Sequence, residues 1–165
     1  MSRAAALHWG GARQGALRFT WPPPPAAGLH QVIAGGEGGV DRAAAHAAHA
    51  LGYKSGGCTQ KGKQRAALNV RDADATLIVY NGAPDEGARR AEEIALRMGK
   101  PVIAVDLADR GGYEQAKAWL VRTSPRVLNI TGGRGARDVG LYARSFAMLV
   151  RLLGPCPVRQ AAETP

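Results

Sequence analysis

Short apolar segments alternate with helical stretches along most of this chain, and that order constrains the fold more than any other feature. The continuous β-branched run at 76–80 is typical of a strand that is buried on both faces. Similar short runs predict strands at 31–34, 102–105 and 126–130 and a weaker one at 52–55. Helical patterns lie at 40–51, 61–71, 87–98, 113–122 and 140–153.

This alternation predicts an α/β fold, a single Rossmann-like three-layer domain with a mostly parallel sheet of about five strands. The length of 165 residues suits one domain. We expect a poorly ordered N-terminal arm at 1–28, where four consecutive prolines favour extended backbone. The ligand-binding domain is expected at 29–154 and a frayed C-terminal tail at 155–165.

Two glycine-rich loops, 35–39 and 131–135, each follow a predicted strand. Right-handed crossovers place all strand-to-helix loops of a parallel sheet at one edge, which is where ligands bind. Glycine lets the backbone approach a ligand closely, and the helix start that follows offers free N–H groups and partial positive charge. The two loops are therefore predicted to form one phosphate-binding site, although they are far apart in the sequence.

The candidate binding residues come from these loops, from the helix start after the first loop and from the turn after the 76–80 strand. They are Gly35, Gly36, Glu37, Gly38, Gly39, Asp41, Arg42, Asn81, Gly82, Thr131, Gly132, Gly133 and Arg134. Arg137, beside the second loop, is a further ligand candidate.

The acidic candidates need separate interpretations. Asp41 either stabilises the dipole of its helix or orients the loop and bonds ligand hydroxyl groups. Glu37 would repel a phosphate unless an arginine pairs with it, and Arg42, Arg71 and Arg134 could do so.

Other titratable residues are expected to serve the structure. Asp72 and Asp74 precede the 76–80 strand, at the opposite edge of the sheet, where they are expected to form capping and turn hydrogen bonds. His46 and His49 lack a third ligand, so no metal site is expected. No nucleophile–base pair follows from spacing, and the catalytic residues therefore remain unknown.

Charge and hydropathy narrow the class of partner. The chain has 22 Lys and Arg against 13 Asp and Glu, a formal charge of +9, and 17 of the cations are arginine. This bias suits anionic partners, although GC-rich coding also produces it. The uncharged run at 19–36 holds four prolines and cannot be a membrane helix, and no signal peptide is visible. We expect a cytoplasmic protein that does not bind membranes.

The segment 32–44, VIAGGEGGVDRAA, resembles the putative molybdenum carrier family, whose motif there is G-G-x-T-G-V-D-R-A. Further matching segments lie at 56–57, 69–78, 99–102 and 128–132. The resemblance spans 31–153 and implies a Rossmann-like protein, often oligomeric, related to the Lonely Guy-type phosphoribohydrolases. It also implies a nucleotide-like ligand or a pterin phosphate such as a molybdopterin-type cofactor at the glycine loops.

The chain departs from that pattern at the expected binding edge. Glu37-Gly38 replaces Gln-Thr, the segment 57–69 is shorter, and 84–87 replaces Gly-Gly-Thr. The phosphoribohydrolase motif P-G-G-x-G-T-x-x-E is absent. These differences bear directly on which ligand is bound.

Binding of a phosphorylated small molecule is therefore the main functional hypothesis, with two alternatives. The start of the first helix, 39–41, also resembles the core of DNA-processing protein A, which favours a single-stranded DNA-binding module. Such a module would use the cations of two stretches, Arg134–Arg151 and the basic stretch Lys54, Lys61, Lys63, Arg65 and Arg71. The second alternative is a nucleotide N-glycosidic hydrolase with Asp41 or Glu92 as its carboxylate.

The last predicted helix carries more apolar side chains than one sheet face requires. These are Leu141, Tyr142, Phe146, Met148, Leu149, Val150, Leu152 and Leu153. They predict a homo-oligomer.

Overall fold

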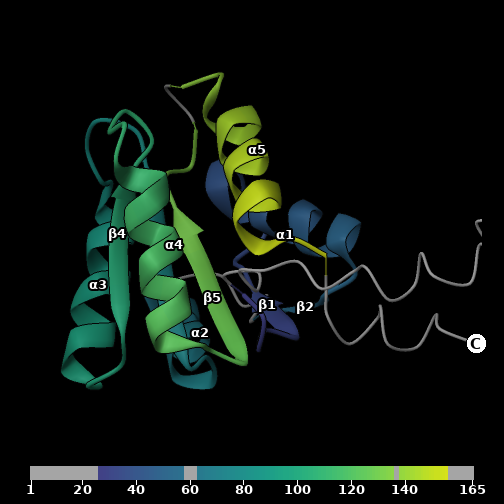
Figure 1. Ribbon diagram of the computed structural model, residues 1–165. Helices are drawn as coiled ribbons and strands as arrows, with labels where there is room; N and C mark the ends of the chain where they lie inside the picture. The colour runs from purple at the N-terminus through teal and green to yellow at the C-terminus, as the bar shows by residue number, and fades with distance from the viewer. Residues whose placement is uncertain (1–25, 58–62, 136–137, 156–165) are drawn as a thin grey trace, which may run out of the picture.

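The computed structural model describes residues 26–57, 63–135 and 138–155. The described elements alternate as the sequence predicts (Figure 1). In chain order they are β1 (Gln31–Ile33), α1 (Gly39–Leu51), β2 (Lys54–Gly56), α2 (Lys63–Asp72), β3 (Ala75–Tyr80), α3 (Glu86–Arg97), β4 (Val102–Asp106), α4 (Gly112–Thr123), β5 (Val127–Gly132) and α5 (Leu141–Leu153). Most of the predicted arm and tail lie outside the described residues. Ala26 and Leu29, on either side of the expected boundary, are both buried.

The strands form one parallel sheet in the order β2-β1-β5-β3-β4. The predicted α/β class and parallel sheet are confirmed. Because β5 returns to the middle of the sheet, it pairs with β1 on one side and β3 on the other, with Asn129 opposite both Ile33 and Thr76. The two glycine-rich loops therefore leave neighbouring strands.

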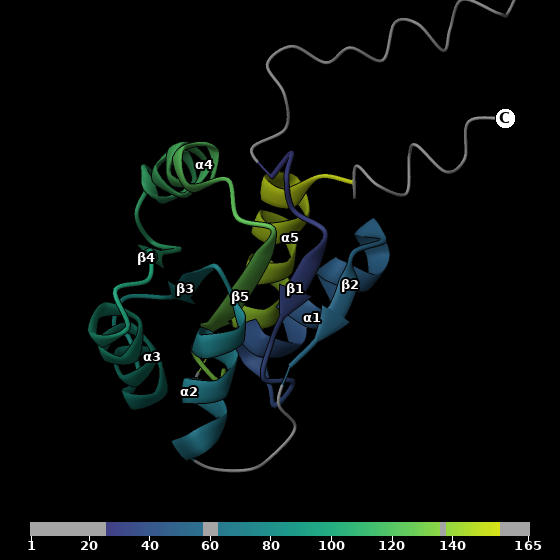
Figure 2. The same cartoon turned by 90° about the horizontal axis from the view of Figure 1, so that it is seen from below.

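Helices cover both faces of the sheet, with α4 and α5 on the side opposite α2 and α3 (Figure 2). Alternate residues of β3 divide between the two sides. Leu77 and Val79 belong to the main core with α1, α4 and α5, whereas Ile78 packs on Ala88 and Ala91 of α3. The apolar core on the α2–α3 side is smaller, and buried polar side chains share that face of the sheet.

The element boundaries differ from the prediction mainly at β2. The strand begins at Lys54 and not at 52, because Gly52 adopts a left-handed conformation (φ 82°) that ends α1. At the opposite edge of the sheet, one carboxylate oxygen of Asp74 accepts hydrogen bonds from the N–H groups of Arg126 and Val127. Its predicted structural role is confirmed. No helix in the described part of the chain is long and apolar enough to cross a membrane.

Candidate functional site

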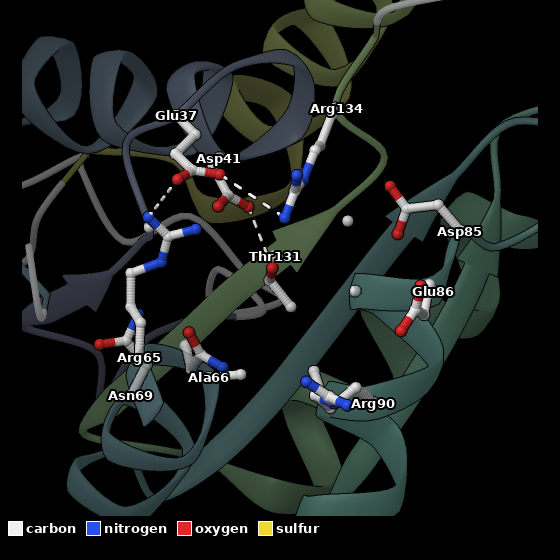
Figure 3. Close-up of a pocket in the computed structure, with 15 residues that line it drawn as sticks. Glu37, Asp41, Arg65, Ala66, Asn69, Asp85, Glu86, Arg90, Thr131 and Arg134 are labelled. Atoms are coloured by element: carbon white, nitrogen blue, oxygen red, sulfur yellow. Dashed lines mark hydrogen bonds and ion pairs between the residues drawn. The ribbon is translucent and has the colours of Figure 1, made fainter. Parts of the chain in front are cut away.

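A pocket of about 400 Å³ opens at the carboxyl edge of the sheet, on the α2–α3 face (Figure 3). The loops after β1 and β5 form one side, the start of α3 forms the other, and α2 closes the end. Its lining comprises Gly35, Glu37, Asp41, Arg65, Ala66, Asn69, Asp85, Glu86, Gly87, Arg90, Ala91, Asn129, Thr131, Gly132 and Arg134.

The two glycine-rich loops touch each other beside this pocket. The N–H of Val40 donates to the carbonyl oxygen of Gly133 at 3.0 Å. Gly39 has φ 51°, and a Cβ there would lie 2.2 Å from the same oxygen. A Cβ on Gly132 would lie 1.8 Å from the carbonyl oxygen of Val79, so β5 approaches β3 this closely only with glycine. The glycines thus bring the loops together by allowing close backbone contact.

Glu37 lies between two arginines (Figure 3). Its carboxylate is 2.8 Å from a guanidinium nitrogen of Arg65 and 3.7 Å from one of Arg134. The side chain of Arg65 is only 13% exposed, whereas that of Arg134 is 68% exposed. The predicted partner Arg134 is thus one of two. Arg65 is the closer one, and Arg71 instead pairs with Asp72.

Asp41 is buried beside the same loops. One of its carboxylate oxygens accepts a hydrogen bond from the Thr131 hydroxyl at 3.0 Å. The other oxygen would lie 2.2 Å from a Cβ on Gly35, so any larger residue there would displace this carboxylate. Burial raises the pKa of Asp41 to about 6; the Thr131 hydrogen bond, the charge of Arg65 and the Gly132 N–H oppose that rise, and Glu37 adds to it. This carboxyl therefore gains and loses its proton near pH 6, well above the range of an ordinary aspartate.

The opposite wall is the start of α3. Asp85 caps the helix by accepting a hydrogen bond from the N–H of Ala88 at 2.8 Å. Glu86 follows in the first turn, and Arg90 lies one turn further along (Figure 3). With the loop side, the described lining has four carboxylates and three guanidinium groups. Such a wall can both accept hydrogen bonds from hydroxyl or amino groups and donate them to an anion.

The structure brings together some of the predicted site residues. Those that line the pocket are Gly35, Glu37, Asp41, Thr131, Gly132 and Arg134. Gly36, Gly38, Gly39 and Gly133 belong to the same two loops but not to the lining.

The remaining candidates lie elsewhere. Arg42 is exposed on α1 and outside the pocket lining. The side-chain amide of Asn81 donates to Asp138, and the N–H of Gly82 donates to Asp106, so both residues serve a neighbouring hydrogen-bond network. Arg137 lies outside the described residues. Glu92 is on α3 but not in the lining.

None of the ligand-binding residues predicted from the sequence belongs to α2, α3 or the middle of β5, and Glu92 of α3 is named only for the hydrolase alternative. Two signals in the sequence indicate the α2 and β5 residues. Arg65 and Asn69 are four residues apart and therefore share one face of α2. Asn129 and Thr131 are two residues apart on an otherwise apolar strand, so they point to the same side of the sheet.

A second hollow of about 380 Å³ lies on the other face, where β4 ends between α4 and α5. There the Arg151 guanidinium lies 4.1 Å from the centre of the Tyr113 ring, and Arg144 pairs with Asp138. The histidines of α1 do not join either hollow, and His46 hydrogen-bonds to the Tyr142 hydroxyl. Among the described residues no group of His, Cys, Asp and Glu is arranged to hold a metal ion.

Comparison with known proteins gives two matches. The sequence pattern of the circularly permutated YpsA SLOG family matches residues 58–153. A solved structure, described as a putative molybdenum carrier protein from Syntrophus aciditrophicus, superimposes with a TM-score of 0.70 at 25% identity, over 78% of this chain and 96% of that one. This likeness confirms the resemblance found in the motifs. No curated protein matches the chain.

Proposed function

The chain belongs to the circularly permutated YpsA SLOG family, and we propose that its pocket binds a phosphorylated small molecule, nucleotide-like or pterin-like, between the two glycine-rich loops. The observation that carries the proposal is the convergence of those loops with Arg65 and Arg134 on one pocket. Its volume of about 400 Å³ lies within the usual range of small-molecule sites.

The phosphate is assigned to the loop side. Arg134 is mostly exposed and reaches Glu37 only at 3.7 Å, so it can turn to an incoming anion at little cost. Arg65 is held more rigidly and adds a second cation. An anion between them gains charge-assisted hydrogen bonds, which are stronger than neutral ones.

The rest of the ligand is assigned to the α3 side. Asp85 already occupies the start of this helix, so a second phosphate is disfavoured there. Its free oxygen and the Glu86 carboxylate instead accept hydrogen bonds from hydroxyl or amino groups. A sugar or a pterin ring supplies such donors.

The molybdenum carrier description of the structural relative suits this class of ligand. A molybdopterin-type cofactor combines a pterin ring with a phosphate, and the pocket offers guanidinium groups for the phosphate and carboxylates for the N–H groups of the ring. When bound, the cofactor would supply the metal chemistry, while this chain binds and orients it.

The direct test is a thermal-shift and native mass spectrometry panel of nucleoside monophosphates and pterin phosphates. A ligand at a hundred times its Kd adds about 2.7 kcal/mol to the free energy of unfolding. The Arg134→Ala variant should lose most of that stabilisation, whereas Arg97→Ala, which removes an exposed arginine at the far end of α3, should keep it. Absence of a shift with every phosphate contradicts the proposal, as does equal loss in both variants.

A second candidate function, hydrolysis of a nucleotide N-glycosidic bond, is favoured by one observation. Asp41 lines the pocket with its pKa raised to about 6, so it can donate a proton to the departing base while water adds to the sugar carbon that the base leaves. Incubation with nucleoside monophosphates should then release free base faster at pH 5.5 than at pH 8, and the Asp41→Asn variant should release none. Unchanged nucleotide after long incubation removes this candidate and leaves the binding proposal intact.

A further inference from the structure

Both helices contribute an alanine to the part of the pocket between α2 and α3, which we call the slot. Ala66 of α2 and Ala91 of α3 both line it. One helical turn further along, Val70 packs with Ile94 and Ala95, so the two helices are joined there by larger side chains. At the pocket end of this helix pair both side chains are small, although Ala91 itself is buried. A slot between two small apolar side chains suits a flat group.

Asn129 lies at the floor of the same pocket, on the central strand β5. It is 2% exposed, and its side-chain amide donates only a long hydrogen bond of 3.4 Å, to the Thr76 hydroxyl. Within the described residues, no donor lies within hydrogen-bond distance of its Oδ1 atom. A buried amide oxygen without a partner destabilises the folded state, so its presence next to a pocket requires an explanation.

We propose that Asn129 Oδ1 accepts a hydrogen bond from an N–H or NH₂ group of a planar heterocycle that enters the slot between Ala66 and Ala91. This inference rests on the proposed function, because the phosphate at the glycine loops anchors the ligand. Asn129 is then a residue that determines specificity. It favours bases with a donor on the edge facing the sheet and disfavours rings without one, since such rings leave the oxygen unpaired.

The experiment measures by calorimetry the affinities of four ligands for the full chain. Ribose 5-phosphate carries the phosphate and hydroxyl groups alone. AMP and GMP add a base with N–H donors, and purine riboside 5′-monophosphate adds a ring of the same shape without them. At least one of AMP and GMP should bind about tenfold or more tightly than purine riboside 5′-monophosphate.

Two variants and a control show which residues cause the difference in nucleotide affinity. Asn129→Leu should abolish the difference between the amino-bearing nucleotides and purine riboside 5′-monophosphate while leaving ribose 5-phosphate binding unchanged. Ala66→Leu, at a half-buried position, should weaken binding of all three nucleotides but not of ribose 5-phosphate, and Ala118→Leu, on exposed α4 surface, should change none of them.

The outcomes separate this inference from the proposed function. If none of the four phosphates binds, the proposed function itself fails, and this inference fails with it. If ribose 5-phosphate binds as tightly as AMP and GMP, or if purine riboside 5′-monophosphate equals both, the assignment of Asn129 is wrong and the phosphate site stands. The wild-type comparison decides this even if Asn129→Leu does not fold.

Discussion

Glu37 holds the two arginines that the proposal assigns to phosphate, and a ligand must compete with its carboxylate. Arg65 lies 2.8 Å and Arg134 3.7 Å from it. The Glu37→Gln variant removes the negative charge and keeps the shape, so inorganic phosphate and ribose 5-phosphate should bind about tenfold more tightly. Titration calorimetry measures this, with Glu93→Gln on the exposed face of α3 as the charge-matched control. Weaker binding by Glu37→Gln would show that the carboxylate contacts the ligand directly.

Asp41 makes folding depend on pH. Its pKa rises from 3.8 in the unfolded chain to about 6 in the folded one, chiefly because of burial, so the folded state binds more protons between these values. The contribution of this group to stability is therefore greatest below pH 3.8 and falls as the pH rises to 6, by about 3 kcal/mol. Asp41→Asn, which stays neutral, should be more stable than the wild type at pH 7.5 and nearly equal to it at pH 3.5.

Denaturant unfolding of the wild type and Asp41→Asn at the two pH values checks this difference. A variant that is less stable than the wild type at pH 7.5 would show that the ionised carboxylate stabilises the fold. In that case the hydrogen bonds that Thr131 and Gly132 donate to the carboxylate outweigh the cost of burying its charge.

At the residue level, the sequence predicts the loop glycines well and their charged neighbours poorly. Gly39 and Gly132 follow from motif and position, because only glycine allows the close backbone contacts made there. Arg65 could not be assigned, since its contact with Glu37 depends on how α2 packs across the sheet edge. Motif spacing carries no information on that packing.

At the level of elements, α2 is held at its C-terminal end by a lysine from another part of the chain. The ammonium group of Lys100 donates hydrogen bonds to the carbonyl oxygens of Val70, Arg71 and Ala73. These carbonyls lie at the negative end of the helix dipole, where a cation is favourable.

The Lys100→Met variant should lower the free energy of unfolding by about 1–3 kcal/mol, because it removes these bonds and keeps most of the apolar stem. Lys117→Met on α4 serves as the control and should change it little. Chemical denaturation compares the two. A Lys100 variant as stable as the control would mean that water replaces the ammonium group without cost. Since α2 carries Arg65 and Asn69, a looser α2 should also weaken ligand binding.

The sequence predicts the elements themselves more fully than the site. Strands β3, β4 and β5 follow from continuous apolar runs, and their helices from periodic ones. The edge strand β2 is exposed throughout, so no apolar pattern fixes its bounds. The role of α3 as a pocket wall depends on strand order, which places β5 between β1 and β3, and local patterns do not encode that order.

At the level of the whole molecule, the predicted homo-oligomer depends on α5. Leu141, Leu149, Leu152 and Leu153 are buried within the chain, mostly against α1. The stacked rings of Tyr142 and Phe146 are only half-buried and remain the candidate contact. Light scattering should give more than one chain per particle at micromolar concentration, and a monomer at all concentrations would contradict this prediction.

The nucleic-acid alternative depends on how the positive charge is distributed over the whole molecule. Of the basic stretch at 54–71, Arg65 turns into the pocket and Arg71 pairs with Asp72. Fewer of the described cations are therefore left to contact the phosphate backbone of a nucleic acid. The formal charge of +9 still predicts some binding of oligonucleotides that weakens steeply with salt. Binding that persists at high salt would favour a specific nucleic-acid site over this general attraction.

A nuclear magnetic resonance titration with AMP shows whether both glycine-rich loops bind one phosphorylated ligand. We expect the largest amide shifts at 35–39 and 131–135 together, including Gly35 and Gly132, and we expect them to saturate along one binding curve. Shifts confined to one loop, shifts centred on Tyr113 in the second hollow, or none at saturating AMP and pterin phosphate would contradict it.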